Sequence, residues 1–290
     1  MMSRRYNILY PVDFSNRCVL AAHYVKVWVD RFGAALNTLH VVDADALGRP
    51  PELQDEFRYN ELPHLMAKRT ADLKHFSDHY FGKNIAHSTV LSGGRAEQIE
   101  YFVKREKIDL IMLPRNHQDL LARILHDSLT ATLLERCTAS VWTTEHLDDA
   151  RPSSVNDILC AVHFERDMTL EAQNHRILQT VRELATRFQA RVTFLRVIDG
   201  NEGREKSFAH LRAISGAEPW LAQARELLGD SAAFLRKTGN VVSAISETAD
   251  QVAADLVVVG RTRPGTIGFG VQGHILEINH VVRRQVLSVW

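Results

Sequence analysis

The sequence lacks several features that would point to particular classes of protein. It has only three cysteines, Cys18, Cys137 and Cys160, and no CxxC pair. This count predicts neither a disulfide framework nor a zinc ribbon. No apolar run approaches the roughly 18 residues of a membrane span, and no apolar signal-peptide core precedes the first strand pattern. We therefore expect a cytoplasmic protein that does not associate with a membrane.

An excess of charge of either sign is also absent. Lys and Arg together number 35, as do Asp and Glu, and apolar residues make up 45% of the chain. A balanced chain has no global basic field that would hold nucleic acid, so we expect no nucleic-acid partner. The composition is that of a globular protein, and 290 residues suffice for two domains of ordinary size.

What the sequence does contain is an internal repeat. Four segments of the first half return in the second half in the same order and at similar spacing: 7–14 as 157–164, 34–43 as 190–199, 108–114 as 254–260, and 140–142 as 288–290. Between the halves lies a polar, proline-containing stretch, as is typical of a linker. The repeat predicts a first domain over residues 1–147, a linker over 148–154 and a second domain over 155–290.

Within each half, short apolar runs alternate with helical patterns. In the first half we predict strands over residues 8–12, 36–42, 85–91, 110–113 and 140–143, with a first helix capped by Ser15. Strands that are apolar on both faces and separated by helices indicate a parallel sheet covered on both sides. The predicted fold class is α/β, with two repeated, doubly wound, parallel five-stranded open sheets of Rossmann-like type. In such sheets, ligands bind beyond the carboxyl ends of the strands.

The two halves differ most in the segments after their second strands, residues 45–73 and 200–229. Both contain apolar and aromatic residues, and a helix packed on the sheet is the simpler interpretation. The alternative is a surface for a protein partner or a small ligand, because loops here overhang the strand ends.

Several motifs at the predicted strand ends are similar to those of one known family. Pro11, Asp13 and Ser15 follow the first strand, the second strand ends in residues 40–43, and a glycine-rich turn at 92–94 precedes a helix. With these motifs the chain resembles the universal stress protein (UspA-like) family in its tandem form. The resemblance implies an adenine nucleotide α-hydrolase-like fold and a regulatory role in stress response. It also implies a pseudo-dimer within the chain, formed by pairing of the fifth strands, and allows a homodimer.

Members of this family that bind ATP carry a loop after strand four that reads Gly, two residues, Gly, nine residues, Gly, then Ser or Thr. Glycines let backbone N–H groups approach phosphates, and the last pair sits at a helix N-terminus that favours anions. In the second half the spacing is kept, but arginine and histidine replace the second glycine and the hydroxyl residue. The candidate cofactor-binding residues there are Gly260, Arg261, Arg263, Gly265, Gly273 and His274. The two arginines could contact phosphate through charged forks, or could simply be solvated in a loop that has drifted.

In the first half, all three glycines of this loop are missing. The corresponding positions are Pro114, His117 and Asp127, while Ser128 retains the hydroxyl. Proline offers no N–H, and Asp127 puts negative charge where phosphate oxygens would lie. Asp13 survives at the position that contacts the nucleoside in the family, although it could equally serve as a partner in capping the first helix. We expect this half not to hold a triphosphate in the manner of the family.

Two sets of histidines could in principle bind a metal ion. His75 and His79 lie four residues apart on a predicted helix, and a further set lies at or beside the loop positions: His117, His126, His163 and His274. A solvated helix face explains the first pair. The second set could serve metal, anion or pH sensing if the fold brings it together. We predict no metal site.

No catalytic constellation is evident. The sequence has no G-x-S-x-G elbow, and Cys18, preceded by Arg17, has no histidine at a telling spacing. We expect a regulatory or stress-response module that is not an enzyme and has no certain cofactor. Two alternatives stay open: an ATP-binding switch whose nucleotide is held by the second domain, and a weak adenine-nucleotide hydrolase.

Overall fold

The computed structural model describes residues 5–43, 60–114, 129–144, 154–162, 168–198, 224–226, 228, 232–261 and 274–290. The chain divides into two compact units. One consists of Met1–Trp142 with Leu147–Ser153, and the other of Thr143–His146 with Ser154–Trp290. We refer to them as domain 1 and domain 2, count the whole of β5 (Ser140–Thr144) with domain 1, and consider each domain by itself.

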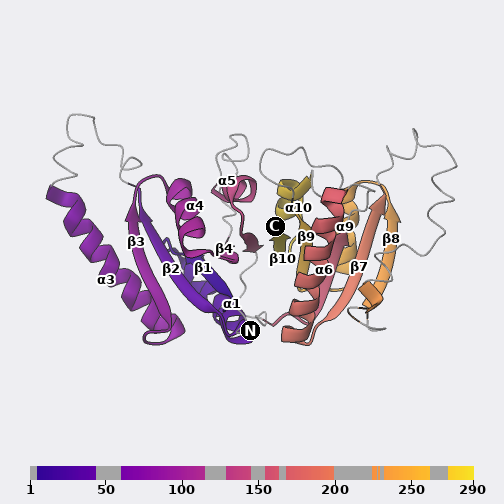
Figure 1. Ribbon diagram of the computed structural model, residues 1–290, viewed down its shortest axis with the longest axis horizontal. Helices are drawn as coiled ribbons and strands as arrows, with labels where there is room; N and C mark the ends of the chain where they lie inside the picture. The colour runs from indigo at the N-terminus through magenta and orange to yellow at the C-terminus, as the bar shows by residue number, and fades with distance from the viewer. Residues whose placement is uncertain are drawn as a thin grey trace. The chain divides into compact units, whose positions relative to one another are not determined.

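Domain 1 is a parallel sheet with helices in the connections (Figure 1). Its described elements are β1 (Asn7–Pro11), α1 (Asn16–Phe32), β2 (Ala35–Val42), α3 (Leu62–Phe81), β3 (Ala86–Ser92), α4 (Arg95–Glu106), β4 (Leu110–Pro114), α5 (Leu129–Arg136) and β5 (Ser140–Thr144). The strand order is β3-β2-β1-β4-β5. Strand β1 pairs in parallel with both β2 and β4, so the order reverses between β1 and β4.

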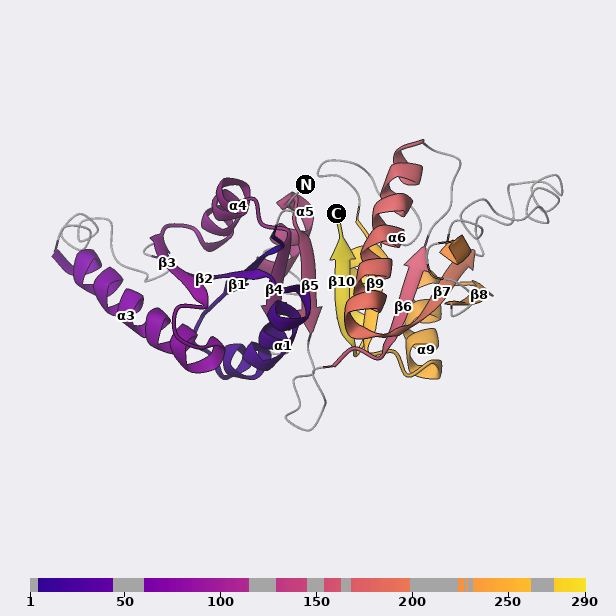
Figure 2. The ribbon, with the colours of Figure 1, turned by 60° about the horizontal axis from the view of Figure 1, so that its bottom comes forward.

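Domain 2 repeats this arrangement (Figure 2). Its described elements are β6 (Asp157–Val162), α6 (Met168–Phe188), β7 (Arg191–Ile198), β8 (Ala232–Thr238), α9 (Val241–Gln251), β9 (Leu256–Gly260), α10 (Ile275–Val281) and β10 (Gln285–Val289). The order β10-β9-β6-β7-β8 is that of domain 1 once the strands are matched, with β6 pairing in parallel with β7 and β9. The predicted fold class, two doubly wound parallel five-stranded sheets, is confirmed.

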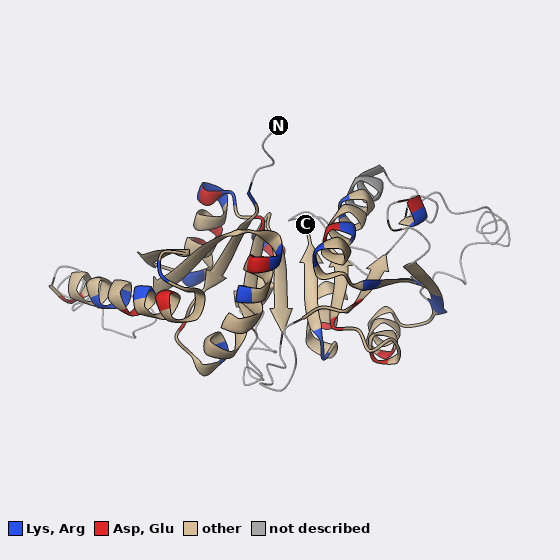
Figure 3. Ribbon diagram, turned by 90° about the horizontal axis from the view of Figure 1, so that it is seen from below, with Lys and Arg blue, Asp and Glu red and all other residues tan. Residues whose placement is uncertain are grey.

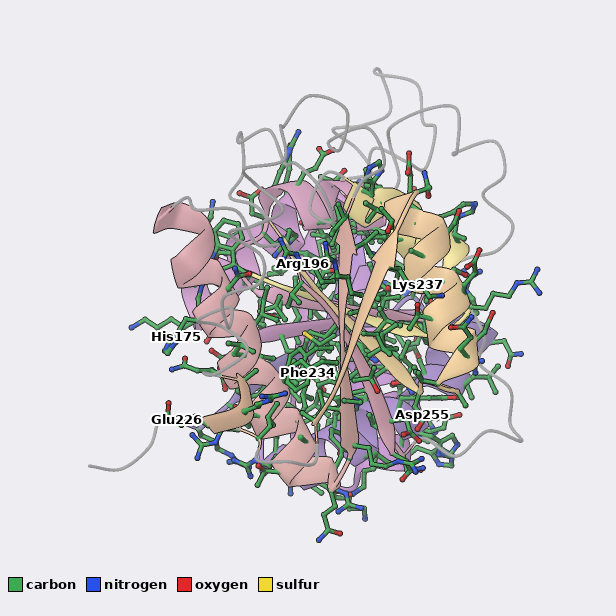
Figure 4. The ribbon with its side chains drawn as sticks, turned by 90° about the vertical axis from the view of Figure 1, so that its right-hand side faces the viewer. His175, Arg196, Glu226, Phe234, Lys237 and Asp255 are labelled. Carbon is green, nitrogen blue, oxygen red and sulfur yellow. The ribbon has the colours of Figure 1, made fainter. Side chains whose placement is uncertain are left out.

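The central strands are apolar on both faces because helices cover both. In β1, Ile8, Leu9 and Tyr10 are fully buried, and every residue of β9 is buried. Figure 4, which looks along domain 2 from its edge, shows α6 on one side of the strands and α9 on the other. A strand with no solvated face reads as a continuous apolar run, which is why the sequence indicated these strands clearly.

The first helix begins and ends as its sequence suggests. Ser15 has extended backbone angles and its side chain accepts a hydrogen bond from the Cys18 N–H, so the prediction of a Ser15 cap is confirmed. At the other end, Gly33 adopts a left-handed conformation, with φ of 58°. Between these ends the helix buries Val25, Trp28 and Val29 against the sheet.

The segment predicted as a helix on the sheet is partly described. Helix α3 packs against β2 and β3 and buries Leu73, Phe76 and Phe81, which confirms that prediction for residues 62–73. Residues 45–59 lie outside the described part of the chain, as do most of residues 200–229.

Charge is mixed along the outer helices. Figure 3 shows basic and acidic residues interspersed along α3, where Lys74 and Asp78 form an ion pair at 3.0 Å. Exposed pairs of this kind contribute little stability but keep a surface well solvated. Among the described residues, no helix is both long enough and apolar enough to cross a membrane.

Candidate ligand-binding edge of each domain

In each domain, the expected ligand site lies beyond the strand ends where the strand order reverses. In domain 1 this places Asp13 and Phe14, which follow β1, near Pro114 at the end of β4. In domain 2 the corresponding positions follow β6 and β9. Of these, Gly260 and Arg261 are described, whereas residues 163–167 and 262–273 are not.

The carboxylate of Asp13 is engaged by its own helix. One oxygen, Oδ1, accepts hydrogen bonds from the Ser15 N–H at 2.9 Å and from the Cys18 thiol at 3.0 Å. Partial burial would raise the pKa of Asp13, but these hydrogen bonds outweigh it and hold the pKa below its ordinary value. The structure therefore places Asp13 in the helix-capping role that its sequence position allowed.

The Cys18 thiol beneath Asp13 is buried. Burial, together with the adjacent carboxylate, raises the pKa of Cys18 to about 12. Its backbone carbonyl accepts a hydrogen bond of 2.6 Å from the Tyr10 hydroxyl. A thiol with such a pKa is protonated at neutral pH and is therefore a poor nucleophile.

Phe14 covers the strand end beside Asp13. Its φ of 60° is in the left-handed region, which is rare for a bulky side chain. Its ring centroid lies 4.7 Å from that of His40 and 6.2 Å from that of Phe76, while the Arg69 guanidinium lies 5.5 Å from it. Rings and a cation thus occupy the space at this edge between β1 and β2.

His40 is fixed within this group by a hydrogen bond to the backbone. Its Nδ1 lies 2.7 Å from the carbonyl oxygen of Val12, and since a carbonyl only accepts, Nδ1 carries the proton. Burial is the largest influence and lowers the pKa of His40; the hydrogen bond to Val12 opposes it, and the charges of Arg69 and Arg95 lower the pKa further. His40 is therefore neutral at pH 7. In the sequence, His40 stands out only as part of a family motif, because no local pattern indicates its contact with Phe14.

The loop after β4 is described only at its first residue. Pro114 ends the strand and is half-buried. The other loop positions named from the sequence, His117, His126, Asp127 and Ser128, lie outside the described residues.

In domain 2, the strand end is formed by Gly260 and Arg261. The backbone N–H of Arg261 donates to the Val289 carbonyl at 2.8 Å, its side chain is only 3% exposed, and its guanidinium lies 5.4 Å from the Trp290 ring centroid. A phosphate contact by Arg261 would require the side chain to leave this packed position. Arg263, Gly265 and Gly273 lie outside the described residues.

His274 lies just before α10, where its Nδ1 is 2.9 Å from a carboxylate oxygen of Glu277. His75 and His79 are exposed on α3, with ring centroids 6.5 Å apart. Among the described residues, no group of three or more His, Cys, Asp or Glu side chains is placed to hold a metal ion.

Two doubly wound sheets of equal strand order define a tandem α/β protein of Rossmann-like type. The sequence model of the Universal stress protein family matches residues 5–144 and again residues 167–273. The chain therefore belongs to the universal stress protein family, with one copy in each half.

Solved structures agree with this fold. A universal stress protein from Archaeoglobus fulgidus is 16% identical, with a TM-score of 0.68, and the match covers 98% of this chain and 95% of that one. A functionally unknown protein from Pseudomonas aeruginosa PAO1 is 15% identical over 99% and 92% of the two chains, with a TM-score of 0.67. The cytoplasmic domain of a prokaryotic cation chloride cotransporter is 11% identical over 98% and 95%, with a TM-score of 0.52. A search of curated proteins gives no match.

Proposed function

We propose that this protein is a cytoplasmic, non-catalytic regulatory module of stress response, and that its domain 1 does not bind a nucleotide. The observation that carries the proposal is the internal closure of the domain 1 strand end. There, Asp13 bonds to its own helix and Phe14 packs against His40 and Arg69. Groups that are already paired with one another gain little by exchanging those partners for a ligand.

The residues at the end of β4 support the same conclusion. A phosphate cradle is built from backbone N–H groups that approach the oxygens closely. Pro114 has no N–H to contribute, and its ring restricts the backbone where the family has glycine. A triphosphate would then lack the backbone donor that the first glycine of the family's loop supplies.

A non-catalytic role is supported by the chemistry of the groups at the same edge. The lowered pKa of Asp13 makes its carboxylate a weak base, and the protonated Cys18 thiol is a weak nucleophile. Neither group suits the activation of water or the attack on a phosphoryl group.

A second candidate function is an ATP-binding switch in domain 2. It is favoured by Gly260 at the end of β9, a position at which a small residue allows close approach of phosphate. In this case Arg263, Gly265, Gly273 and His274 would complete the loop, with Arg261 displaced from Trp290. A weak adenine-nucleotide hydrolase would be an extension of this switch.

Calorimetric titration of the full chain with ATP and magnesium tests the proposal. We expect binding weaker than millimolar. Tighter binding that Gly273→Asp abolishes and Ser128→Ala preserves would establish the domain 2 switch in its place. Tighter binding that Ser128→Ala abolishes and Gly273→Asp preserves would show that domain 1 holds the nucleotide, and would overturn the proposal. Release of phosphate above the background rate would indicate the hydrolase.

A further inference from the structure

A small cleft lies in domain 2 between the C-terminal end of α6 and the starts of β7 and β8. Its volume is about 260 Å³. Glu226, two residues before Leu228, lies on the side of the sheet that α6 covers (Figure 4). Apolar side chains from the helix, the strands and this segment line the cleft: Ala185, Ala190, Val192, Leu228 and Ala232.

Domain 1 carries larger side chains at two equivalent positions. The connections from α1 to β2 and from α6 to β7 have the same length, and both helices end in phenylalanine. Val29 therefore corresponds to Ala185, and Leu36 to Val192. Val29 and Leu36 are buried in domain 1, with 5% and 2% of their surface exposed. The smaller residues of domain 2 leave room beside the helix, as the removal of methyl groups from a packed region does.

One cation lines this cleft without a partner. In the part of domain 2 that the structure describes, the guanidinium of Arg182 forms no ion pair or hydrogen bond. The neighbouring carboxylate, that of Glu183, lies 3.3 Å from the guanidinium of Arg187. The hydroxyl of Thr186, which also lines the cleft, donates to the Arg182 carbonyl at 2.8 Å. The charge of Arg182 is therefore available to an anion at the cleft.

The equivalent cation of domain 1 is neutralised within its own helix. By the same correspondence, Lys26 matches Arg182 and Asp30 matches Thr186. Lys26 and Asp30 form an ion pair at 2.6 Å, four residues apart on α1. Domain 2 has thus kept the positive charge, lost the intrahelical carboxylate and gained an apolar cleft at the same place. An anion with an apolar body would restore the missing partner and fill the space.

We propose that this cleft binds a small carboxylic acid with a short hydrocarbon chain. The carboxylate would pair with Arg182, whose planar fork of donors matches two carboxylate oxygens. The chain would lie among the apolar side chains, where each buried CH₂ group adds to the affinity. Gln189, which is exposed and lines the cleft, offers a further amide donor. A volume of about 260 Å³ suits a ligand smaller than a nucleotide.

This site is separate from the candidate nucleotide edge. The cleft lies where β7 and β8 begin, whereas Gly260 is at the end of β9. Strands β7, β8, β6 and β9 are parallel, so these are opposite edges of the sheet, separated by the length of a strand, or about 17 Å for five residues. Binding at the cleft and binding of ATP can therefore fail independently.

Calorimetric titration of the full chain with hexanoate, at constant ionic strength, tests the site. We expect saturable binding, and butanoate should bind more weakly by roughly fourfold for each CH₂ group removed. Arg182→Gln should weaken the binding of hexanoate by about tenfold, because a charge-assisted partner is lost. The matched control is Arg176→Gln, which removes an exposed arginine of the same helix that does not line the cleft and should leave the affinity unchanged.

A second variant tests the cleft itself. Ala185→Leu places a larger side chain in the space and should abolish binding of hexanoate, while a melting temperature measured by circular dichroism shows whether the fold is kept. If this variant does not fold, the two arginine variants on the solvated side of α6 decide the outcome.

Four results would overturn the proposal. The first is an absence of saturable hexanoate binding by the unaltered chain. The second is an equal effect of Arg182→Gln and Arg176→Gln on the affinity. The third is binding of hexylammonium as tight as that of hexanoate, which would show an apolar hollow that does not select charge. The fourth is unchanged binding by a folded Ala185→Leu variant, which would place the ligand elsewhere.

Discussion

At the scale of single residues, Phe14 and His40 explain why the domain 1 strand end is closed. A residue with a β-carbon pays roughly 1–2 kcal/mol to adopt the left-handed conformation, and Phe14 does so with φ of 60°. The conformation is retained because it brings the ring to His40, Phe76 and Arg69. Backbone conformations that are unfavourable by themselves but stabilised by surrounding contacts are common at functional sites.

The pKa of His40 leads to a prediction about pH. Burial lowers that pKa in the folded state, so the unfolded chain binds a proton first as the pH falls. The stability that neutral His40 contributes is complete above the ordinary value of about 6.5 and decreases below it. His40→Gln should therefore make the free energy of unfolding less dependent on pH between about 6.5 and 5. Denaturant titrations at several pH values measure this.

The matched control for that prediction is His23→Gln, because His23 is exposed on α1. It should leave the pH dependence as it is in the unaltered chain. If both substitutions flatten the dependence equally, burial of His40 is not what lowers its pKa in the folded protein.

At the scale of elements, helix termini show how short sequence signals fix local structure. Ser15 caps α1 by accepting from the Cys18 N–H at 3.4 Å, and Asn240 caps α9 by accepting from the Ser243 N–H at 2.9 Å. Helix α4 instead begins after Gly94 without a side-chain cap. Caps of this kind satisfy backbone donors that the helix leaves unpaired.

Removal of the α1 cap should destabilise domain 1. Ser15→Ala is expected to lower the free energy of unfolding by about 1 kcal/mol, whereas Ser15→Asp, which keeps an acceptor, should retain most of it. Denaturant unfolding followed by circular dichroism measures both variants. Asn240→Ala provides the parallel case in domain 2. Equal stability of Ser15→Ala and the unaltered chain would show that the 3.4 Å contact contributes nothing.

At the scale of the whole molecule, the repeat made the fold predictable. Strand β1 was expected over residues 8–12 and occupies Asn7–Pro11, and β4 was expected over 110–113 and occupies Leu110–Pro114. Buried parallel strands leave a strong apolar signal, and two ordered copies of that signal reinforce each other. The Universal stress protein family match over both halves agrees with this reading.

The site was less predictable, because its contacts join residues that are distant in sequence. Ser15 and Asp13, just before α1, indicated capping of that helix from local sequence alone, and the Asp13 carboxylate does accept a hydrogen bond from the Ser15 N–H. No local pattern indicates that Arg261 packs on Trp290 or that Phe14 meets His40. Spacing identified the loop positions, but packing against other strands decides where their side chains lie.

The central claim is that domain 1 has lost the ability to hold a triphosphate at its strand end. Photolabelling of the full chain with an azido analogue of ATP, followed by peptide mapping, tests it most directly. We predict no labelled peptide from residues 5–144, at any concentration at which labelling is competed by unmodified ATP. A competed label on a peptide that contains Asp13 or Pro114 would contradict the account.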